Sequence, residues 1–341
     1  MESYGTLPDG REAGIFTLAN RHGIRVRLTD FGAILVSVET PDRNGVLAPI
    51  TLGYDTLEGW VNDPFYLGAT VGRFGNRLRD GKFTLDGKSY SLALNNEPGG
   101  IPCHLHGGAT GFNKRLWDAS VSPDGQAVTF TYHSPDGEEG YPGNLTARVT
   151  YTLTDDNELI WEAEAVTDAA TPINLIHHSY WNLSGDPTRP IVDHHLLLAA
   201  DHFLPTDPGM IPTGEMHAVA GTPMDFTTPH LIGDRIAADF EALHLAGGYD
   251  HCWIINGEPG ILRPAARVYH PGSGRVMELL SDPPGLQFYA GNFLDEPRHR
   301  AGLCLETQNF PDAPNQPAFP NSILRPGETY RHVMVHRFGV E

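Results

Sequence analysis

The chain has 341 residues, of which 40% are hydrophobic, 38 are glycine and 28 are proline. This glycine and proline content exceeds the usual share of roughly 12%, argues against a mostly helical protein, and favours short strands joined by tight turns. The net charge of −19 disfavours a nucleic-acid partner, which normally meets a basic face. No apolar run approaches the length needed to span a bilayer, so no membrane partner is expected.

The first predicted strands are short and alternate apolar with polar side chains. Residues 23–29 follow this pattern, and residues 127–132 repeat it further along the chain. Between them, residues 83–92 form two short runs around Asp86-Gly87, which is the strongest short signal for a β-hairpin. These segments are rich in Val, Thr, Tyr and Phe, which suit a half-buried pleated surface.

A second hairpin is predicted where residues 145–153 and 158–166 flank a Thr-Asp-Asp-Asn turn. Helical periodicity is confined to residues 232–245, where we expect a helix of two or three turns. No internal repeat and no flexible linker divides the chain. The sequence therefore predicts one all-β domain over residues 1–341.

The N-terminal residues have neither a basic nor an apolar segment, so no secretory signal is predicted and a cytoplasmic location is expected. Cys103, Cys252 and Cys304 are far apart and have no CxxC spacing, which predicts neither a zinc ribbon nor a disulfide framework. We expect Cys304 to be a buried, inert thiol rather than a reactive one.

Histidines mark two places where chemistry is expected. On a strand, His104 and His106 would point to the same face, as two metal ligands must, but no spacing marks a third ligand. The alternative is that one of them is structural. His177 and His178 are adjacent, so their rings would face opposite sides of a strand and at most one can serve a given site.

Other catalytic patterns are missing from the sequence. There is no GxSxG nucleophile elbow, and residues 71–77 lack the GxGxxG pattern of a phosphate loop. What remains is a histidine and a carboxylate: His178, whose ordinary pKa of about 6.5 suits proton transfer, and Glu306, the one charged residue in CLETQNF. Either could instead be a structural hydrogen-bonding or ion-paired group, and spacing alone does not bring them together.

Nine motifs, in order along nearly the whole chain, resemble the aldose 1-epimerase family, also called galactose mutarotases. They include GATVGRFGNR from residue 68, LHGGATGF from 105, EGYPGNL from 139, TPINLIHHSYWNLSG from 171, PTGE from 212, GTPMDF from 221, GGYDHCW from 247, PGLQFYAGNFL from 284 and LETQNFPDAPNQ from 305. The resemblance implies a single large antiparallel β-sandwich with an open carbohydrate cleft. It also implies an enzyme without metal or organic cofactor that interconverts the α and β anomers of free aldohexoses such as galactose and glucose.

The same resemblance assigns residues to roles. The HSYxNL element places the catalytic acid at His178, and the LETQ element places the catalytic base at Glu306. Residues expected to bind the sugar come from the other motifs: Asn76, Arg77, His106, Tyr180, Asp250 and Gln287. The expected partner is a small-molecule sugar, and the expected assembly is a monomer or a homodimer.

Three departures from the family pattern are expected near the cleft. His177 stands where Asn is more usual, Trp181 stands where Phe is common, and the loop over residues 95–104 is slightly longer. Trp181 is expected either to cover an apolar sugar face or to pack in the core. We expect these differences to bear on substrate preference more than on the chemistry.

Three other functions compete with this one. A hexose-6-phosphate 1-epimerase would need a basic cluster, which the net charge disfavours. A non-catalytic carbohydrate-binding protein on the same fold would be expected to lack His178 or Glu306. A metal-dependent sugar isomerase or lyase would use His104 and His106, and its activity would respond to a chelator.

Overall fold

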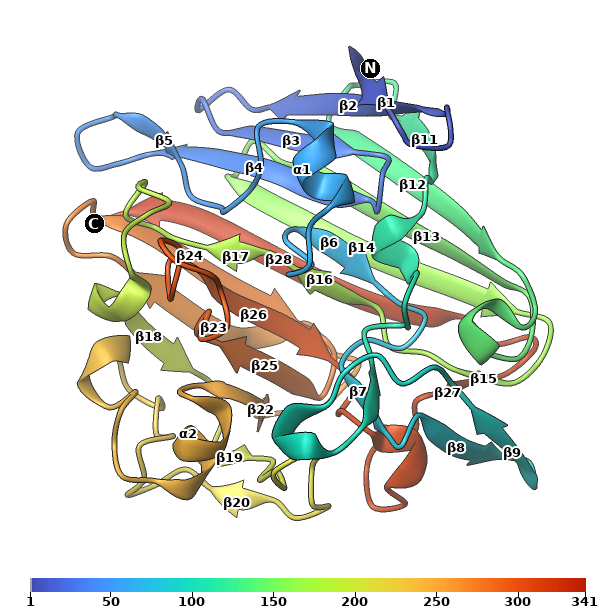
Figure 1. The fold of residues 1–341 in the computed structure, drawn as a ribbon. Helices are drawn as coiled ribbons and strands as arrows, with labels where there is room; N and C mark the ends of the chain where they lie inside the picture. The colour runs from blue at the N-terminus through green and yellow to red at the C-terminus, as the bar shows by residue number, and fades with distance from the viewer. Residues whose placement is uncertain (1) are drawn as a thin grey trace.

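The computed structural model describes residues 2–341, and antiparallel strands account for most of its regular structure (Figure 1). Nine strands form the largest sheet, in the order β11 (Asp118–Val121), β12 (Ala127–Ser134), β13 (Leu145–Leu153), β14 (Glu158–Thr167), β28 (Tyr330–Val340), β24 (Arg275–Ser281), β23 (Arg263–Tyr269), β18 (His195–Leu198) and β21 (His230–Leu231). Near its middle, β28 pairs with β14 on one side and β24 on the other. The predicted all-β class is therefore confirmed.

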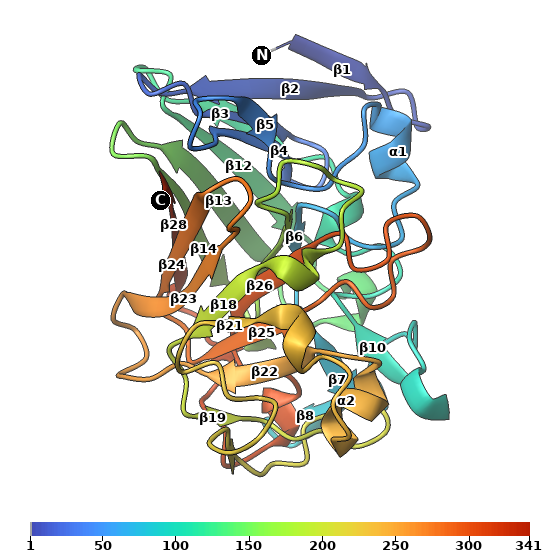
Figure 2. The same cartoon turned by 90° about the vertical axis from the view of Figure 1, so that its left-hand side faces the viewer.

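A six-stranded sheet packs against the large one (Figure 2). Its order is β17 (Tyr180–Trp181), β26 (Leu303–Gln308), β25 (Gly285–Tyr289), β22 (Asp250–Ile254), β19 (His202–Phe203) and β20 (His217–Ala218). Side chains of both sheets share one apolar core, in which Trp161 and Met277 of the large sheet join Leu286 and Leu305 of the smaller one. This face-to-face burial makes the protein a β-sandwich.

Smaller sheets complete the fold. A five-stranded sheet lies at the top of Figure 1 and consists of β1 (Glu2–Thr6), β2 (Glu12–Ala19), β3 (Arg25–Thr29), β4 (Ile34–Pro41) and β5 (Leu47–Pro49). Four strand pairs are β6 (Ala69–Val71) with β16 (Ile176–His178), β7 (Arg77–Arg79) with β10 (Cys103–Leu105), β8 (Lys82–Leu85) with β9 (Lys88–Ser91), and β15 (Thr171–Pro172) with β27 (Ile323–Leu324). The pairs β6–β16 and β7–β10 carry the residues of the site described below.

The predicted strands and hairpins are present. β13 and β14 pair from Leu145 to Leu153 as expected. β8 and β9 are joined by Asp86 and Gly87, whose φ angles of 51° and 79° are those of a hairpin turn with two left-handed residues. The strands predicted over 23–29 and 127–132 appear as β3 and β12.

The helical prediction is wrong in its extent. Residues 232–245 contain a single 3-10 turn (Ile232–Asp234) and the start of a short helix, α2 (Glu241–Ala246), which ends at Gly247 in a left-handed conformation. The apolar residues Ile232, Ile236 and Leu243 are each buried, although the segment that holds them is not one continuous helix. A further helix, α1 (Leu57–Val61), was not predicted. No helix among residues 2–341 is long and apolar enough to cross a membrane.

Candidate active site

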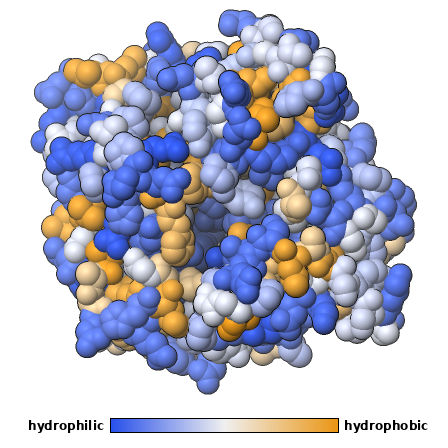
Figure 3. All heavy atoms as spheres, in the orientation of Figure 1, coloured by the Kyte–Doolittle hydropathy of each residue, from blue (hydrophilic) through white to orange (hydrophobic). Residues whose placement is uncertain are grey.

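A cleft of about 500 Å³ opens beside the six-stranded sheet. Figure 3 shows a hollow near the middle of the face of the molecule that it draws. All eight residues expected at a site line this cleft: Asn76, Arg77, His106, His178, Tyr180, Asp250, Gln287 and Glu306. They come from strands or strand ends that are spread along the chain from Asn76 to Glu306. The fold therefore gathers into one place what the sequence presents as separate motifs.

Strand register sets the position of the polar side chains on the floor of the cleft. Gln287 of β25 lies between Cys252 of β22 and Glu306 of β26 in the pairing of the three strands. Asp250 is two residues before Cys252, so it points to the same face of the sheet as Gln287 and Glu306. Gln287 Nε2 donates a hydrogen bond of 2.7 Å to Asp250 Oδ1, which fixes the orientation of that carboxylate.

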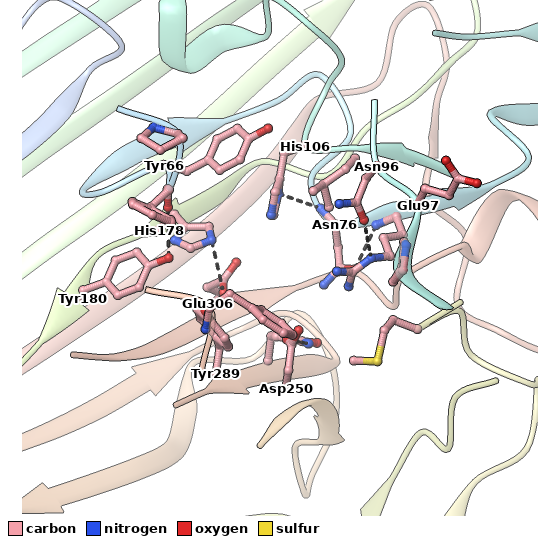
Figure 4. A pocket seen from close by; sticks show the side chains of 18 of the residues that line it. Tyr66, Asn76, Asn96, Glu97, His106, His178, Tyr180, Asp250, Tyr289 and Glu306 are labelled. Atoms are coloured by element: carbon pink, nitrogen blue, oxygen red, sulfur yellow. Dashed lines mark hydrogen bonds and ion pairs between the residues drawn. The ribbon is translucent and has the colours of Figure 1, made fainter. Parts of the chain in front are cut away.

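Glu306 and His178 face each other across the cleft (Figure 4). Glu306 Oε1 lies 3.7 Å from His178 Nε2. The other carboxylate oxygen, Oε2, is buried and has no hydrogen-bond partner among the described residues. Because an unpaired buried polar atom is costly, Oε2 marks a place where a ligand hydroxyl would be stabilised.

Burial dominates the electrostatics of this pair. It raises the pKa of Glu306 well above its ordinary value, with the nearby charge of Asp250 adding to the effect and that of Arg77 opposing it. Burial lowers the pKa of His178 to about 4. Both shifts oppose the ordinary order of the two pKa values, in which that of a carboxyl lies below that of an imidazole. Such a pair is suited to moving a proton in either direction.

His106 is held in a defined tautomer. It follows β10 with a φ of 52°, and its Nδ1 accepts a hydrogen bond of 3.1 Å from the backbone N–H of Asn76. The ring hydrogen of the neutral form must therefore lie on Nε2. Burial lowers the pKa of His106, with the charge of His178 adding to this effect, so the neutral form prevails. His106 is thus a hydrogen-bond donor at the cleft.

The two arginines of the GRFGNR motif have different environments. Arg73 is buried and donates to the carbonyl oxygens of Pro142 and Gly143 and to the hydroxyl of Ser134, so it is a structural residue. Arg77 lines the cleft, and its Nε donates to Asn96 Oδ1 at 3.3 Å. Arg77 is therefore the arginine that a ligand can reach.

Two alternatives left open near the cleft are settled by the packing: Trp181 packs in the core rather than covering a sugar face, and His177 points away from the cleft. The side chain of His177 is buried against Trp161 and Trp181, and Trp181 packs on His336 and Phe338. Neither residue lines the cleft. Both lie on strand positions that point into the core, because neighbouring side chains alternate between the two faces of a strand. Of the three departures from the family pattern, only the loop over 95–104 reaches the cleft, through Asn96, Glu97, Pro98 and Gly99.

The alternative in which His104 and His106 together bind a metal is not supported by the geometry. His104 Nδ1 contacts the carbonyl oxygen of Ala93 at 2.8 Å, and its Nε2 contacts the Tyr141 hydroxyl at 2.7 Å. Both ring nitrogens of His104 are therefore engaged away from His106. β10 ends at Leu105, and the positive φ of His106 breaks the alternation on which the pairing depended.

Two sets of side chains have the spacing of metal ligands, but not every ligand atom in them has a free lone pair. His106, His178 and Glu306 offer ligand atoms within 4.8 Å of one another, as do Asp193, His194 and His270. In the first set, His106 presents an N–H to the cleft, because its Nδ1 accepts the Asn76 N–H. In the second, His194 Nε2 accepts the Leu183 N–H, so Nδ1 bears the hydrogen and donates to Asp193. His270 Nδ1 likewise accepts the Ser273 N–H, so its Nε2 bears the hydrogen. The first set therefore has two ready ligands and the second has one, fewer than a zinc site needs.

Sequence reasoning missed Tyr66, Asn96 and Phe293, which also line the cleft. No local pattern marks an aromatic residue in a turn as part of a site. Asn96 had an indirect signal, because it lies in the loop that differs from the family pattern. Cys304 was expected to be an inert thiol and is buried, with its Sγ 3.7 Å from His178 Nδ1 and its pKa raised by burial.

Comparison with known proteins places this chain in a family. The aldose 1-epimerase family model matches residues 14–337. Galactose mutarotase from Bos taurus is 45% identical over 99% of this chain and 97% of its own length. Aldose 1-epimerase from Escherichia coli is 35% identical over 100% of this chain and 99% of its own length.

Solved structures agree. Galactose 1-epimerase from Lactobacillus acidophilus superimposes with a TM-score of 0.86 at 30% identity, covering 99% of this chain and 98% of that one. An aldose epimerase homologue from C. elegans gives a TM-score of 0.87 at 30% identity, covering 96% and 99%. The chain belongs to the aldose 1-epimerase family of carbohydrate-acting enzymes.

Proposed function

We propose that this protein is an aldose 1-epimerase that interconverts the α and β anomers of free aldohexoses such as galactose and glucose. One observation carries the proposal: a buried carboxylate with an unpartnered oxygen lies 3.7 Å from a histidine at the floor of the cleft. Mutarotation needs one base and one acid near a single carbon, and Glu306 and His178 supply them. The family relationship supports the same reaction.

In the proposed mechanism, Glu306 takes the proton of the C1 hydroxyl while His178 gives a proton to the ring oxygen. The bond between C1 and the ring oxygen breaks, and an open-chain aldehyde forms. Rotation about the C1–C2 bond presents the other face of the carbonyl. The ring then closes with the two roles exchanged, so that the enzyme returns to its starting state. Acid–base assistance of this kind contributes roughly 10²–10⁴-fold for each group.

The shifted pKa values favour such an exchange. A proton moves readily between two groups when their proton affinities are similar. Burial raises the pKa of Glu306 and lowers that of His178, so the proton that the two groups share can lie on either of them. The reaction as proposed starts from the state in which that proton is on His178. The reaction needs one proton shared by Glu306 and His178. We therefore expect activity to fall at high pH, where the pair loses that proton, and at low pH, where it gains a second.

The surrounding residues are proposed to hold the sugar. Asp250, oriented by Gln287, can accept hydrogen bonds from two hydroxyl groups. Arg77 and His106 can donate to sugar oxygens and to partial negative charge on the opening ring. Asn76 offers an amide at the cleft. Tyr180 is proposed to contribute its ring, because its hydroxyl donates to the carbonyl oxygen of Phe65.

The charges of the cleft favour a neutral sugar over a hexose 6-phosphate. Glu97, Asp250 and Glu306 bring carboxyl groups to the lining, and Arg77 is the single arginine or lysine among the described residues there. A phosphate group would normally need several basic partners. We further propose that residues 1–341 act as one domain in the cytoplasm, as a monomer or homodimer. The core cluster that runs from Phe16 to Phe338 supports the single domain.

Polarimetry of freshly dissolved α-D-galactose and α-D-glucose, with a chelator present, tests the proposal. We expect the wild-type protein to accelerate the decay of rotation, and Glu306→Gln and His178→Asn to remove that acceleration. The same substitutions at exposed positions, Glu164→Gln and His133→Asn, serve as matched controls. A wild-type rate equal to that of buffer would refute the free-hexose activity, and loss of activity with chelator would indicate a metal mechanism.

A further inference from the structure

The turn over residues 63–67 has a conformation that its sequence does not favour. Tyr66 has a φ of 59°, in the left-handed region that bulky residues rarely adopt. Such a conformation persists only where the surroundings determine it, and it is found most often at functional sites.

Hydrogen bonds fix the turn from both ends. The buried carboxylate of Asp63 accepts the backbone N–H groups of Phe65 at 3.1 Å and Leu67 at 2.8 Å, one on each side of Tyr66. The Tyr180 hydroxyl donates to the carbonyl oxygen of Phe65 at 2.9 Å. The backbone on either side of Tyr66 is therefore held, and its side chain is directed toward the cleft.

The turn is anchored to its surroundings as well. Asp63 Oδ1 accepts a hydrogen bond from the Tyr54 hydroxyl at 2.9 Å. Lys114 Nζ donates to the carbonyl oxygen of Asp63 at 2.8 Å and to that of Val61 at 2.9 Å. Lys114 thereby ties the turn to the end of α1. A turn with this many fixed contacts can hold a side chain in one position.

The ring of Tyr66 lies against both histidines of the cleft. Its centroid is 4.6 Å from that of His106 and 5.9 Å from that of His178, with an angle of 30° between the planes of Tyr66 and His178. The ring of Tyr180 is 5.2 Å from His178, also at 30°. Figure 4 shows His178 between the two tyrosines, so aromatic rings limit its rotation.

We propose that Tyr66 is a positioning residue, whose ring is held by the 63–67 turn against His106 and His178 and sets the planes in which the two imidazoles meet the sugar. This inference rests on the proposed function of the cleft. A small rotation of His178 would move Nε2 away from Glu306, and misplaced acid–base groups lose rate steeply. The ring face of Tyr66 also favours a positive charge on the imidazole beside it.

The tyrosine hydroxyl is not needed for this role. Burial raises the pKa of Tyr66 to about 12, so the hydroxyl remains protonated at neutral pH. The groups that face His178 and can titrate or carry charge are few: Glu306 from β26, Cys304 from the same strand, His106 after β10, Tyr180 from β17 and Tyr66 itself. Loss of the Tyr66 ring therefore changes one side of this environment and leaves the others in place.

Two variants test the proposal. Tyr66→Asn removes the ring but places a residue that tolerates the left-handed conformation, so the fold is expected to survive. Tyr66→Phe keeps the ring and removes the hydroxyl. With wild-type protein as reference, we expect Tyr66→Asn to lower kcat at least tenfold with KM within about twofold, and Tyr66→Phe to stay within about threefold in kcat. Thermal unfolding confirms that both are folded.

A second readout does not depend on activity. The imidazole resonances of His106 and His178 are followed by NMR from pH 4 to 8 in the wild type and both variants. We expect shifted resonances and an altered titration in Tyr66→Asn, and wild-type behaviour in Tyr66→Phe. Unchanged spectra and an unchanged kcat in folded Tyr66→Asn would overturn the proposal, as would a rise in KM alone, which would make Tyr66 a sugar contact. A wild-type protein without mutarotase activity would instead refute the proposed function, while the NMR comparison would still test the placement of the histidines.

Discussion

His177 and His178 are neighbours on β16, and they meet opposite surroundings. His178 faces the cleft, where it lies 3.7 Å from a carboxylate and beside an opening for a ligand. His177 faces the core, where its ring is 5.8 Å from that of Trp161 and 5.5 Å from that of His336. Both side chains are almost fully buried.

Burial lowers the pKa of both histidines, so a perturbed pKa does not tell them apart. What distinguishes His178 is the carboxylate of Glu306 beside it and its place in the lining of the cleft. His177 has a hydroxyl contact, with Ser179 Oγ at 3.0 Å, and an Nδ1 without a partner among the described residues. A shifted pKa is therefore a sign of function only together with a cleft and a second titratable group.

The sharpest test of this contrast is to replace His178 and His177, which lie on opposite faces of β16, each by Asn. We expect His178→Asn to lower kcat by about 10²–10⁴-fold, because it removes the proposed acid, while the free energy of unfolding changes by less than about 1 kcal/mol. Initial rates of mutarotation and urea unfolding measure the two quantities. His177→Asn is the control and should keep kcat within about threefold. Equal losses of kcat in the two variants would contradict the assignment.

The core histidines make stability depend on pH. Burial lowers the pKa of His336 to about 4 and that of His332 to about 3 in the folded protein, while both are ordinary in the unfolded chain, near 6.5. The stability linked to their neutral forms is therefore complete above pH 6.5 and is lost as the pH falls toward 4. We expect roughly 3 kcal/mol to be lost through His336 alone by pH 4. Urea unfolding at pH 7, 6, 5 and 4 measures this.

His336→Phe supplies the matched comparison for that pH series. Neither ring nitrogen of His336 has a hydrogen-bond partner among the described residues, so an apolar ring of similar shape should be tolerated at pH 7. The variant is expected to lose less stability on acidification than the wild type. Identical pH curves would mean that His336 does not contribute to the acid sensitivity.

A cavity in the core should lower the free energy of unfolding without changing KM for the sugar. His177→Ala removes a buried ring from among Tyr151, Trp161 and Trp181. We expect the free energy of unfolding to fall by about 2 kcal/mol, because the surrounding aromatic side chains cannot fully close the space. KM for galactose should remain within about twofold. A raised KM with unchanged stability would place His177 functionally at the cleft.

The smallest expected effect concerns a hydrogen bond on the cleft side. Gln287→Leu removes the donor that orients Asp250. A hydrogen bond to a charged group contributes about 1.5 kcal/mol, so KM for galactose should rise roughly tenfold while kcat changes by less than about threefold. Steady-state polarimetry at several sugar concentrations gives both constants. An unchanged KM would show that Asp250 is held without Gln287.

Local signals in the sequence were sufficient for much of the fold. The Asp86-Gly87 turn and the alternation over 145–153 predict hairpins that involve only neighbouring residues. α1 also had a signal that was not used, because Thr56 caps it and accepts a hydrogen bond from Gly59. The pairing of β28 with β14 and β24 has no local signature, since the strands are far apart along the chain.

The candidate site was predictable only through the order of its motifs. Resemblance to a family brought His178 and Glu306 together, whereas spacing did not. Tyr66 could not be found in this way, because its position depends on Asp63 and Tyr180 and on a backbone conformation that tyrosine rarely adopts. The core positions of His177 and Trp181 depend on which face of each strand is inward, and that is decided by the packing of the two sheets.

The placement of β28 has a consequence for how the protein is made. β14 ends at Thr167 and its neighbour in the sheet, β28, begins at Tyr330. During synthesis at roughly 5–20 residues per second, one edge of β14 waits on the order of ten seconds or longer before the strand that covers it exists. An uncovered strand edge is a template for pairing with another chain. The nascent chain is thus most exposed to aggregation in that interval, and chaperone dependence should rise when translation of the intervening segment is slowed.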